Sequence, residues 1–206
     1  MKKIVIIMAI SFISLNIFSQ FSVGGKIGPF GIAYQTGSGN ENMNILYSFQ
    51  GGAVFSFQVA KWFALQTELN YERKGKHYSN EDISITFNKD ALDLSYITIP
   101  LLMRFNTPGK VKFFGQLGPY LGILISAKAR NRDNITYYVK DSYKTTDFGL
   151  AYGVGLLFPI ANNLSMNLES RSSIGFINVY ERNSYMNWKA HNVVWHLIFG
   201  VVYTIN

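Results

Sequence analysis

Seven charged side chains are the residues of this chain most able to do chemistry, because the alternation described below places them on one face of its strands. They are Lys26, Glu68, Glu72, Arg104, Lys112, Glu169 and Arg171. If that face is enclosed, each charge must find a partner. We therefore expect the three glutamates to neutralise Arg104, Lys112 and Arg171, and Arg104→Ala to destabilise the fold by leaving a carboxylate unpaired. The alternative interpretation is a narrow path for an ion or a proton.

Other chemistry finds little support. His196 shares the charged face with Ser173 and Glu169, but an acyl hydrolase of the outer membrane would hold such a triad toward the lipid. His77 and His191 fall in or beside expected loops. The glycines of 24–28 precede no helix and lack the Gly-Lys-Ser/Thr ending of a phosphate loop. We expect no catalytic residue, no cofactor and no metal site.

The elements that position these residues are strands. In Tyr96–Phe105 the odd positions are large and apolar, whereas the even positions include Thr98 and Arg104. This period of two indicates a strand with one apolar face. After residue 20 no window keeps the period of a helix. The expected strands are 21–34, 45–59, 63–74, 96–105, 111–125, 148–158, 164–176 and 192–203.

The connections between these strands alternate between long and short. Residues 36–44, 76–90, 127–145 and 179–190 are expected loops, and the other connections are tight turns. Barrels of the outer membrane have short periplasmic turns and long external loops. A soluble eight-stranded barrel would also have to bury more aromatic volume than its bore holds. The pattern therefore predicts an all-β, eight-stranded, antiparallel, up-and-down transmembrane β-barrel. Aromatic residues near the short turns are expected to form a girdle at the membrane boundary: Trp62, Phe63, Phe105, Phe113, Phe158 and Tyr203.

The first 19 residues read as a secretory signal peptide, so we expect residues 20–206 to form one barrel domain. Met1-Lys2-Lys3 is a basic start, 4–18 is mostly apolar, and Ser19 is a small residue before the expected cleavage point. The protein is therefore expected to be exported.

The composition narrows the function further. The chain of 206 residues has no Cys, which excludes disulfides and cysteine nucleophiles. Its formal charge of +7 falls to +5 when Lys2 and Lys3 leave with the signal peptide. The basic residues are scattered rather than clustered, so nucleic acid is not an expected partner.

Several motifs resemble the small outer-membrane β-barrel family of Bacteroidetes, often called PorT-like. They are Gly24-Gly25-Lys26-Ile27-Gly28, the segment 69–75, Tyr96 to Leu102, the segment 115–120 and Gly153-Val154-Gly155. The resemblance covers nearly the whole mature chain and implies a Gram-negative outer membrane. One member of that family takes part in assembling a protein-secretion machine.

We expect a non-enzymatic outer-membrane barrel with a lumen plugged by side chains and an envelope-structural, adhesion or docking role. Its expected partners are outer-membrane lipid and an envelope protein at the external loops. The loop tyrosines are either an interaction surface or plain interfacial aromatics: Tyr137, Tyr138, Tyr143, Tyr180 and Tyr185. The alternatives are an outer-membrane lipid-modifying enzyme and a soluble periplasmic binding barrel.

Overall fold

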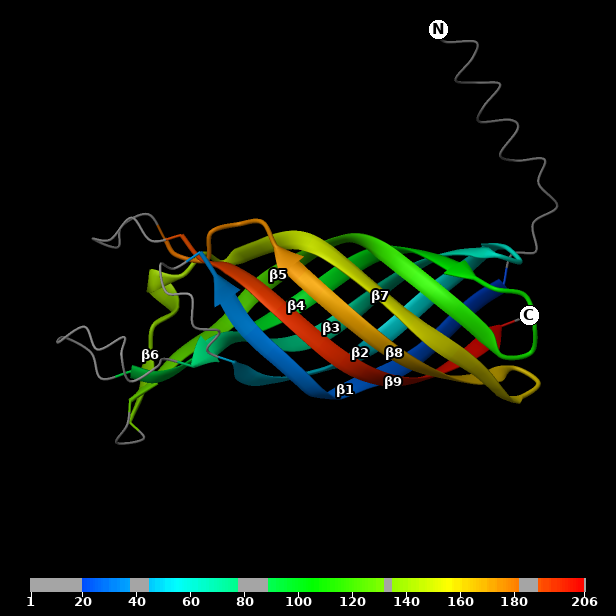
Figure 1. The fold of residues 1–206 in the computed structure, drawn as a ribbon, viewed down its shortest axis with the longest axis horizontal. Helices are drawn as coiled ribbons and strands as arrows, with labels where there is room; N and C mark the ends of the chain where they lie inside the picture. The colour runs from blue at the N-terminus through cyan, green and yellow to red at the C-terminus, as the bar shows by residue number, and fades with distance from the viewer. Residues whose placement is uncertain (1–19, 38–44, 78–88, 132–134, 182–188, 206) are drawn as a thin grey trace, which may run out of the picture.

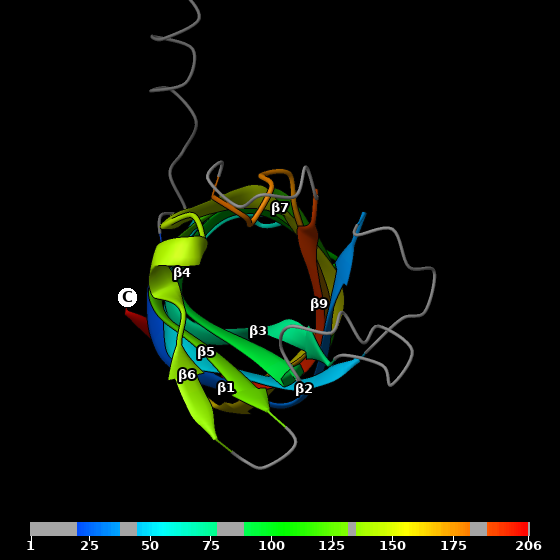
Figure 2. The ribbon, with the colours of Figure 1, turned by 90° about the vertical axis from the view of Figure 1, so that its left-hand side faces the viewer.

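The computed structural model describes residues 20–37, 45–77, 89–131, 135–181 and 189–205. These residues form a single closed sheet (Figures 1 and 2). Its strands are β1 (Gln20–Thr36), β2 (Leu46–Ala60), β3 (Phe63–His77), β4 (Lys89–Asn106), β5 (Lys112–Asn131), β6 (Thr136–Tyr138), β7 (Thr146–Ala161), β8 (Leu164–Gly175) and β9 (His191–Ile205). A short 3-10 turn, η1 (Lys140–Ser142), precedes β7.

Closure of the sheet makes an eight-stranded antiparallel barrel. The order is β4-β3-β2-β1-β9-β8-β7-β5-β6, and pairing of β4 with β5 closes the ring. The short β6 pairs with residues 128–130, near the end of β5, and projects outside the ring (Figure 2). The predicted fold class is confirmed.

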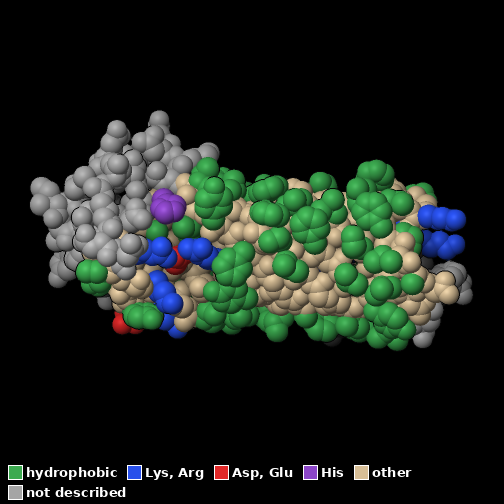
Figure 3. Space-filling view, turned by 90° about the horizontal axis from the view of Figure 1, so that it is seen from below, with side chains coloured by type: hydrophobic (Ala, Val, Ile, Leu, Met, Phe, Trp, Pro, Cys, Tyr) green, Lys and Arg blue, Asp and Glu red, His purple; other side chains and the backbone are tan. Residues whose placement is uncertain are grey.

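The apolar faces of the strands point outward. Leu101 is 56% exposed, whereas its neighbour Leu102 is fully buried. Phe55 is also exposed, while Glu68 and Arg104 are buried inside. Figure 3 shows hydrophobic side chains spread along the face of the barrel in view. A soluble barrel would show the opposite orientation, so the alternative of a soluble binding barrel is wrong.

The two ends of the barrel differ as predicted. At the turn end, β2–β3, β4–β5 and β7–β8 are joined by short connections, and Gly109 there has a φ of 124° that favours glycine. At the loop end, the chain makes its long connections (Figure 1). The expected girdle lies at the turn end, where Trp62, Phe63 and Phe105 pack ring against ring.

One predicted loop is wrong in part. Residues 127–145 were expected to be a loop, but β5 continues to Asn131 and forms a hairpin with β6. A break in register beside Ile125 explains the difference. Outward side chains are odd-numbered up to Ile125 and even-numbered from Lys128 onward, so the bulge ends the simple alternation while the strand goes on.

A similar irregularity lies in β1. Its register shifts between Gly28 and Gly31, where Pro29 has no N–H to donate to the ladder. Ile27 and Phe30 both point outward as a result.

The predicted signal peptide, residues 1–19, lies outside the described residues. No helix among the described residues is long and apolar enough to cross a membrane.

Candidate functional site

The middle of the lumen holds four charged side chains in direct contact, which we call the central ion cluster: Lys26, Glu68, Glu169 and Arg171. Arg171 donates from Nη1 and Nη2 to the two oxygens of Glu68, at 2.6 and 2.8 Å. Its Nε also pairs with Glu169, and Lys26 pairs with Glu68. All four side chains are 4% exposed or less. The bidentate geometry is the strong form of a charge-assisted pair.

Polar side chains around this cluster donate further hydrogen bonds to its carboxylates. Gln66 and Asn70 donate to Glu68 at 2.6 and 2.9 Å. Gln116 donates to Glu169 at 2.6 Å. Arg104 reaches the cluster only indirectly, because its Nη1 donates to Gln66 at 2.9 Å and its guanidinium lies 3.5 Å from the centre of the Phe114 ring.

A second group of charges lies nearer the loop end, and we call it the outer ion cluster: Glu72, Lys74 and Asp147. Lys74 Nζ lies 3.0 Å from Asp147 and 3.4 Å from Glu72. Tyr120 and Asn192 donate to Asp147 at 3.1 and 3.2 Å. Lys74 is fully buried, and its ammonium lies 4.2 Å from the centre of the Tyr120 ring.

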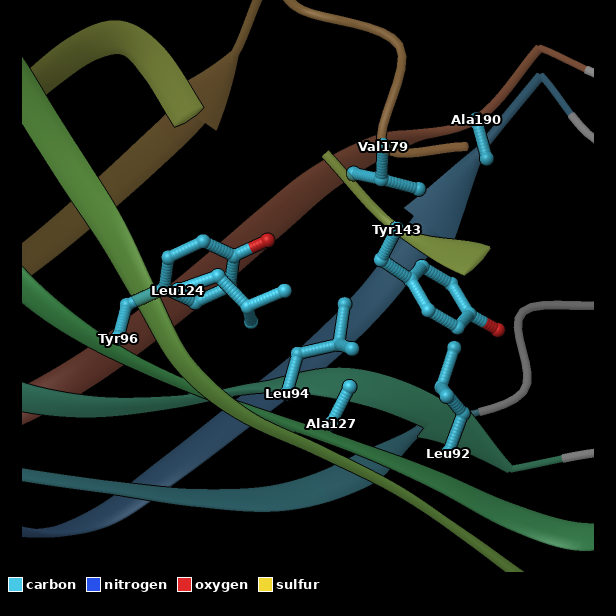
Figure 4. Close-up of a cluster of buried hydrophobic side chains, with 8 residues drawn as sticks. All are labelled: Leu92, Leu94, Tyr96, Leu124, Ala127, Tyr143, Val179 and Ala190. Carbon is cyan, nitrogen blue, oxygen red and sulfur yellow. The ribbon is translucent and has the colours of Figure 1, made fainter. Parts of the chain in front are cut away.

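A cluster of buried hydrophobic side chains lies at the loop end (Figure 4). It adjoins the outer ion cluster through Tyr96, whose ring centre lies 5.3 Å from Lys74 Nζ. This apolar cap consists of Leu92, Leu94, Tyr96, Leu124, Ala127, Tyr143, Val179 and Ala190. Backbone hydrogen bonds join the segments that carry these residues. Lys144 N donates to Val179 O at 2.9 Å, and Val179 N donates to Ala190 O at 2.8 Å.

Little free space remains between these groups. A cavity between the two clusters, beside Glu72 and Arg171, measures about 10 Å³, which is at the lower limit for one water molecule. A cavity of about 100 Å³ opens at the turn end and is lined by residues that include Arg104 and Lys112. Between the two ion clusters, the described side chains therefore leave room for about one water molecule in the smaller cavity.

The family that this architecture belongs to follows from the sequence match. The model of the outer membrane protein beta-barrel domain matches residues 12–181. The chain belongs to this outer-membrane β-barrel family. Among curated proteins, no sequence matches the chain significantly.

Solved structures of other outer-membrane barrels are similar to this family member. Neisserial surface protein A is 14% identical with a TM-score of 0.54, over 90% of this chain and 97% of that one. OprG from Pseudomonas aeruginosa is 13% identical with a TM-score of 0.53, over 92% and 97%. A major outer membrane protein from Thermus thermophilus is 16% identical with a TM-score of 0.52, over 91% and 99%. Identities this low establish the shared fold alone.

Among the seven charged residues singled out in the sequence, four meet in the central ion cluster of this outer-membrane barrel. Glu72 lies in the outer ion cluster instead, with Lys74. Lys112 is half-buried at the mouth of the turn end.

The expected pairing of Arg104 with a glutamate is not what the structure shows, because Arg171 contacts both Glu68 and Glu169. Sequence reasoning missed Asp147, which precedes the predicted sixth strand. Continuing the alternation of that strand by one residue places Asp147 on the inner face.

His196 has different neighbours from those expected. Its Nε2 lies 2.8 Å from Ser48 Oγ, and its Nδ1 lies 3.7 Å from Glu72. Glu169, an expected neighbour of His196, instead pairs with Arg171. Ser173, the other expected neighbour, is a buried residue of β8. Ser48 donates its proton to the Arg73 carbonyl, so it is not poised to give that proton to His196.

The described residues contain no group of three His, Cys, Asp or Glu side chains that could hold a metal ion.

Proposed function

We propose that this family member is exported to the Gram-negative outer membrane and works there without catalysis and without conducting solutes. Its role is envelope-structural, adhesive or docking, and its outer surface and external loops carry that role. Family membership and the outward apolar band support the location.

The single observation that carries this proposal is the occupied lumen. The described residues include five buried cations and four buried anions, namely Lys26, Lys74, Lys76, Arg104 and Arg171 with Glu68, Glu72, Asp147 and Glu169. An ion entering this bore would have to break contacts that compensate buried charges, and such charges are costly to leave unpaired. The barrel wall and the loops are then the surfaces left for function.

An outer-membrane lipid-modifying enzyme is the second candidate, and the site gives it little support. Ser48, Glu72 and His196 resemble a triad in their residue types, but each is 4% exposed or less and points into the plugged lumen. A lipid substrate lies on the other side of the wall. We propose that the three are structural.

Docking of an envelope protein would use the loop end. Tyr137 and Tyr138 of β6 are 51% and 78% exposed there, and exposed tyrosines are frequent anchors at protein interfaces. Tyr143 belongs to the apolar cap instead, Tyr180 packs against it, and Tyr185 lies outside the described residues. A part in assembling a secretion machine, as the PorT-like resemblance implies, is one form that such docking would take.

Planar-bilayer recording tests this proposal. The mature chain, refolded in detergent and inserted into a lipid bilayer, is expected to give no steady conductance in 1 M salt. A general diffusion porin inserted in the same bilayer is the positive control. Stable single-channel steps from the wild-type chain would contradict the plugged lumen and the function that rests on it.

A further inference from the structure

A groove of about 470 Å³ lies on the outer wall near the loop end, where β3, β4, β5 and β6 run side by side. We call it the basic groove. It is lined by Phe49, Tyr71, Arg73, Asp93, Ser95, Lys128, Arg130, Thr136 and Tyr138. The bulge in β5 creates it, because the change of phase turns Lys128 and Arg130 outward, and the β5–β6 hairpin adds Thr136 and Tyr138 beside them.

The groove carries a net positive charge. Arg73, Lys128 and Arg130 face a single carboxylate, Asp93, which leaves an excess of two positive charges among its lining residues. Asp93 pairs with Arg73, and its other oxygen lies 3.8 Å from Arg130. Lys128 extends toward Tyr138, with its ammonium 5.5 Å from the centre of that ring. Lys128 and Arg130 are both exposed.

The position of the groove along the barrel is as informative as its charge. On β3 the outward apolar residues run from Phe63 to Tyr71, and Arg73 is the next outward residue. These nine residues match the length that a tilted strand needs to cross the hydrocarbon core. The basic groove therefore begins where the apolar band ends, at the depth of lipid head groups. Figure 3 shows Lys and Arg side chains gathered at this edge of the band.

An apolar depression continues from the groove into the band. It measures about 500 Å³ and is lined by Ile27, Pro29, Phe49, Gln50, Gly51 and Tyr71. Phe49 and Tyr71, which stack with their centroids 5.7 Å apart, line both hollows. Gly51 deepens the depression, since its outward position has no side chain.

We propose that the two hollows together hold one phosphorylated glycolipid of the outer leaflet. The phosphate lies in the basic groove against Lys128 and Arg130, and an acyl chain lies in the apolar depression beside Gly51. Arginine donates to phosphate in a bidentate manner and lysine acts as a point charge. The site needs the membrane location but not a closed lumen, so the bilayer recording above and the test below can fail independently.

Native mass spectrometry of the mature chain in detergent micelles, titrated with bis-phosphorylated lipid A, tests this site. The wild-type chain is expected to bind one lipid. Lys128→Gln with Arg130→Gln is expected to weaken binding on the order of 25-fold, at about 5-fold for each cation near the membrane surface. Removing both phosphates from the lipid is expected to weaken binding to the wild-type chain similarly.

Two further variants separate this site from general charge and from a free-anion site. Lys61→Gln with Lys110→Gln removes two exposed cations at the turn end and is expected to leave binding unchanged. Gly51→Leu is expected to fill the depression and weaken lipid binding. A Cβ at this position meets only the Lys26 carbonyl oxygen, at 3.6 Å, which is ordinary van der Waals contact. Folding of every variant is checked by heat-modifiable gel migration.

The proposal is overturned if the Lys128 and Arg130 double variant binds like the wild-type chain, or if the turn-end variant weakens binding equally. Displacement of the lipid by millimolar inorganic phosphate would also overturn it, because that result identifies a site for free anions.

Discussion

At the scale of single residues, Arg171 holds the two carboxylates of the central ion cluster together. It contacts Glu68 through two nitrogens and Glu169 through a third. Arg104 is equally buried but contacts an amide and an aromatic ring instead. The two arginines therefore have different energetic roles despite the same residue type and the same inward position.

Arg171→Met is expected to lower the free energy of unfolding by about 3–5 kcal/mol, because it removes the guanidinium that contacts both buried carboxylates, Glu68 and Glu169. Arg104→Met is the matched control, and we expect it to cost at most about 1–2 kcal/mol through a lost hydrogen bond and ring contact. Urea unfolding of the refolded protein in micelles, followed by tryptophan fluorescence, measures both. Equal losses for the two variants would contradict the assigned roles.

The sequence alone predicts which residues face inward but not which of them pair. Alternation with a period of two places Glu68, Glu169 and Arg171 on one face, and the structure has them there. Pairing depends on how far each strand is staggered against the next and on the reach of each side chain. The contact of Arg171 with Glu68 crosses 103 positions of the chain, and no local pattern encodes that distance.

At the scale of elements, neighbouring strands pack together by placing a large inward side chain beside a glycine. Phe114 of β5 lies against Gly155 of β7, where a Cβ would come within 2.5 Å of the ring and 2.4 Å of the Leu168 carbonyl oxygen. Glycines at inward positions thus leave room for large side chains in the lumen. The sequence shows how many glycines there are. It does not predict the bulge in β5, after which the strand continues and pairs with β6.

Gly155→Ala is expected to destabilise the barrel by roughly 1–3 kcal/mol, because the added methyl group overpacks a contact with backbone that cannot yield easily. Gly115→Ala on β5 is the control: a Cβ there meets nothing within 4 Å, so its effect should stay within about 0.5 kcal/mol. The same urea titration reports both values. A Gly155→Ala variant as stable as Gly115→Ala would show that this packing is looser than described.

At the scale of the whole molecule, one orientation accounts for the fold and the proposed function together. Apolar side chains face the lipid, ionic side chains are enclosed, and a plugged bore leaves the outer surface to interact. Both the eight-strand closure and the two unlike ends follow from patterns in the sequence. The cap at the loop end does not, because it joins residues from separate parts of the chain: 92–96, 124–127, 143, 179 and 190.

Spin labelling along β4 tests that orientation most directly, and the absence of Cys from the chain allows single cysteines to be placed at will. Labels at residues 98 to 103, in protein reconstituted into lipid bilayers, are compared for collision with oxygen, which concentrates in hydrocarbon. We predict high oxygen accessibility at Ile99, Leu101 and Met103 and low accessibility at Thr98 and Leu102. The opposite alternation, with labels at 99, 101 and 103 shielded and those at 98 and 102 accessible, would contradict the account.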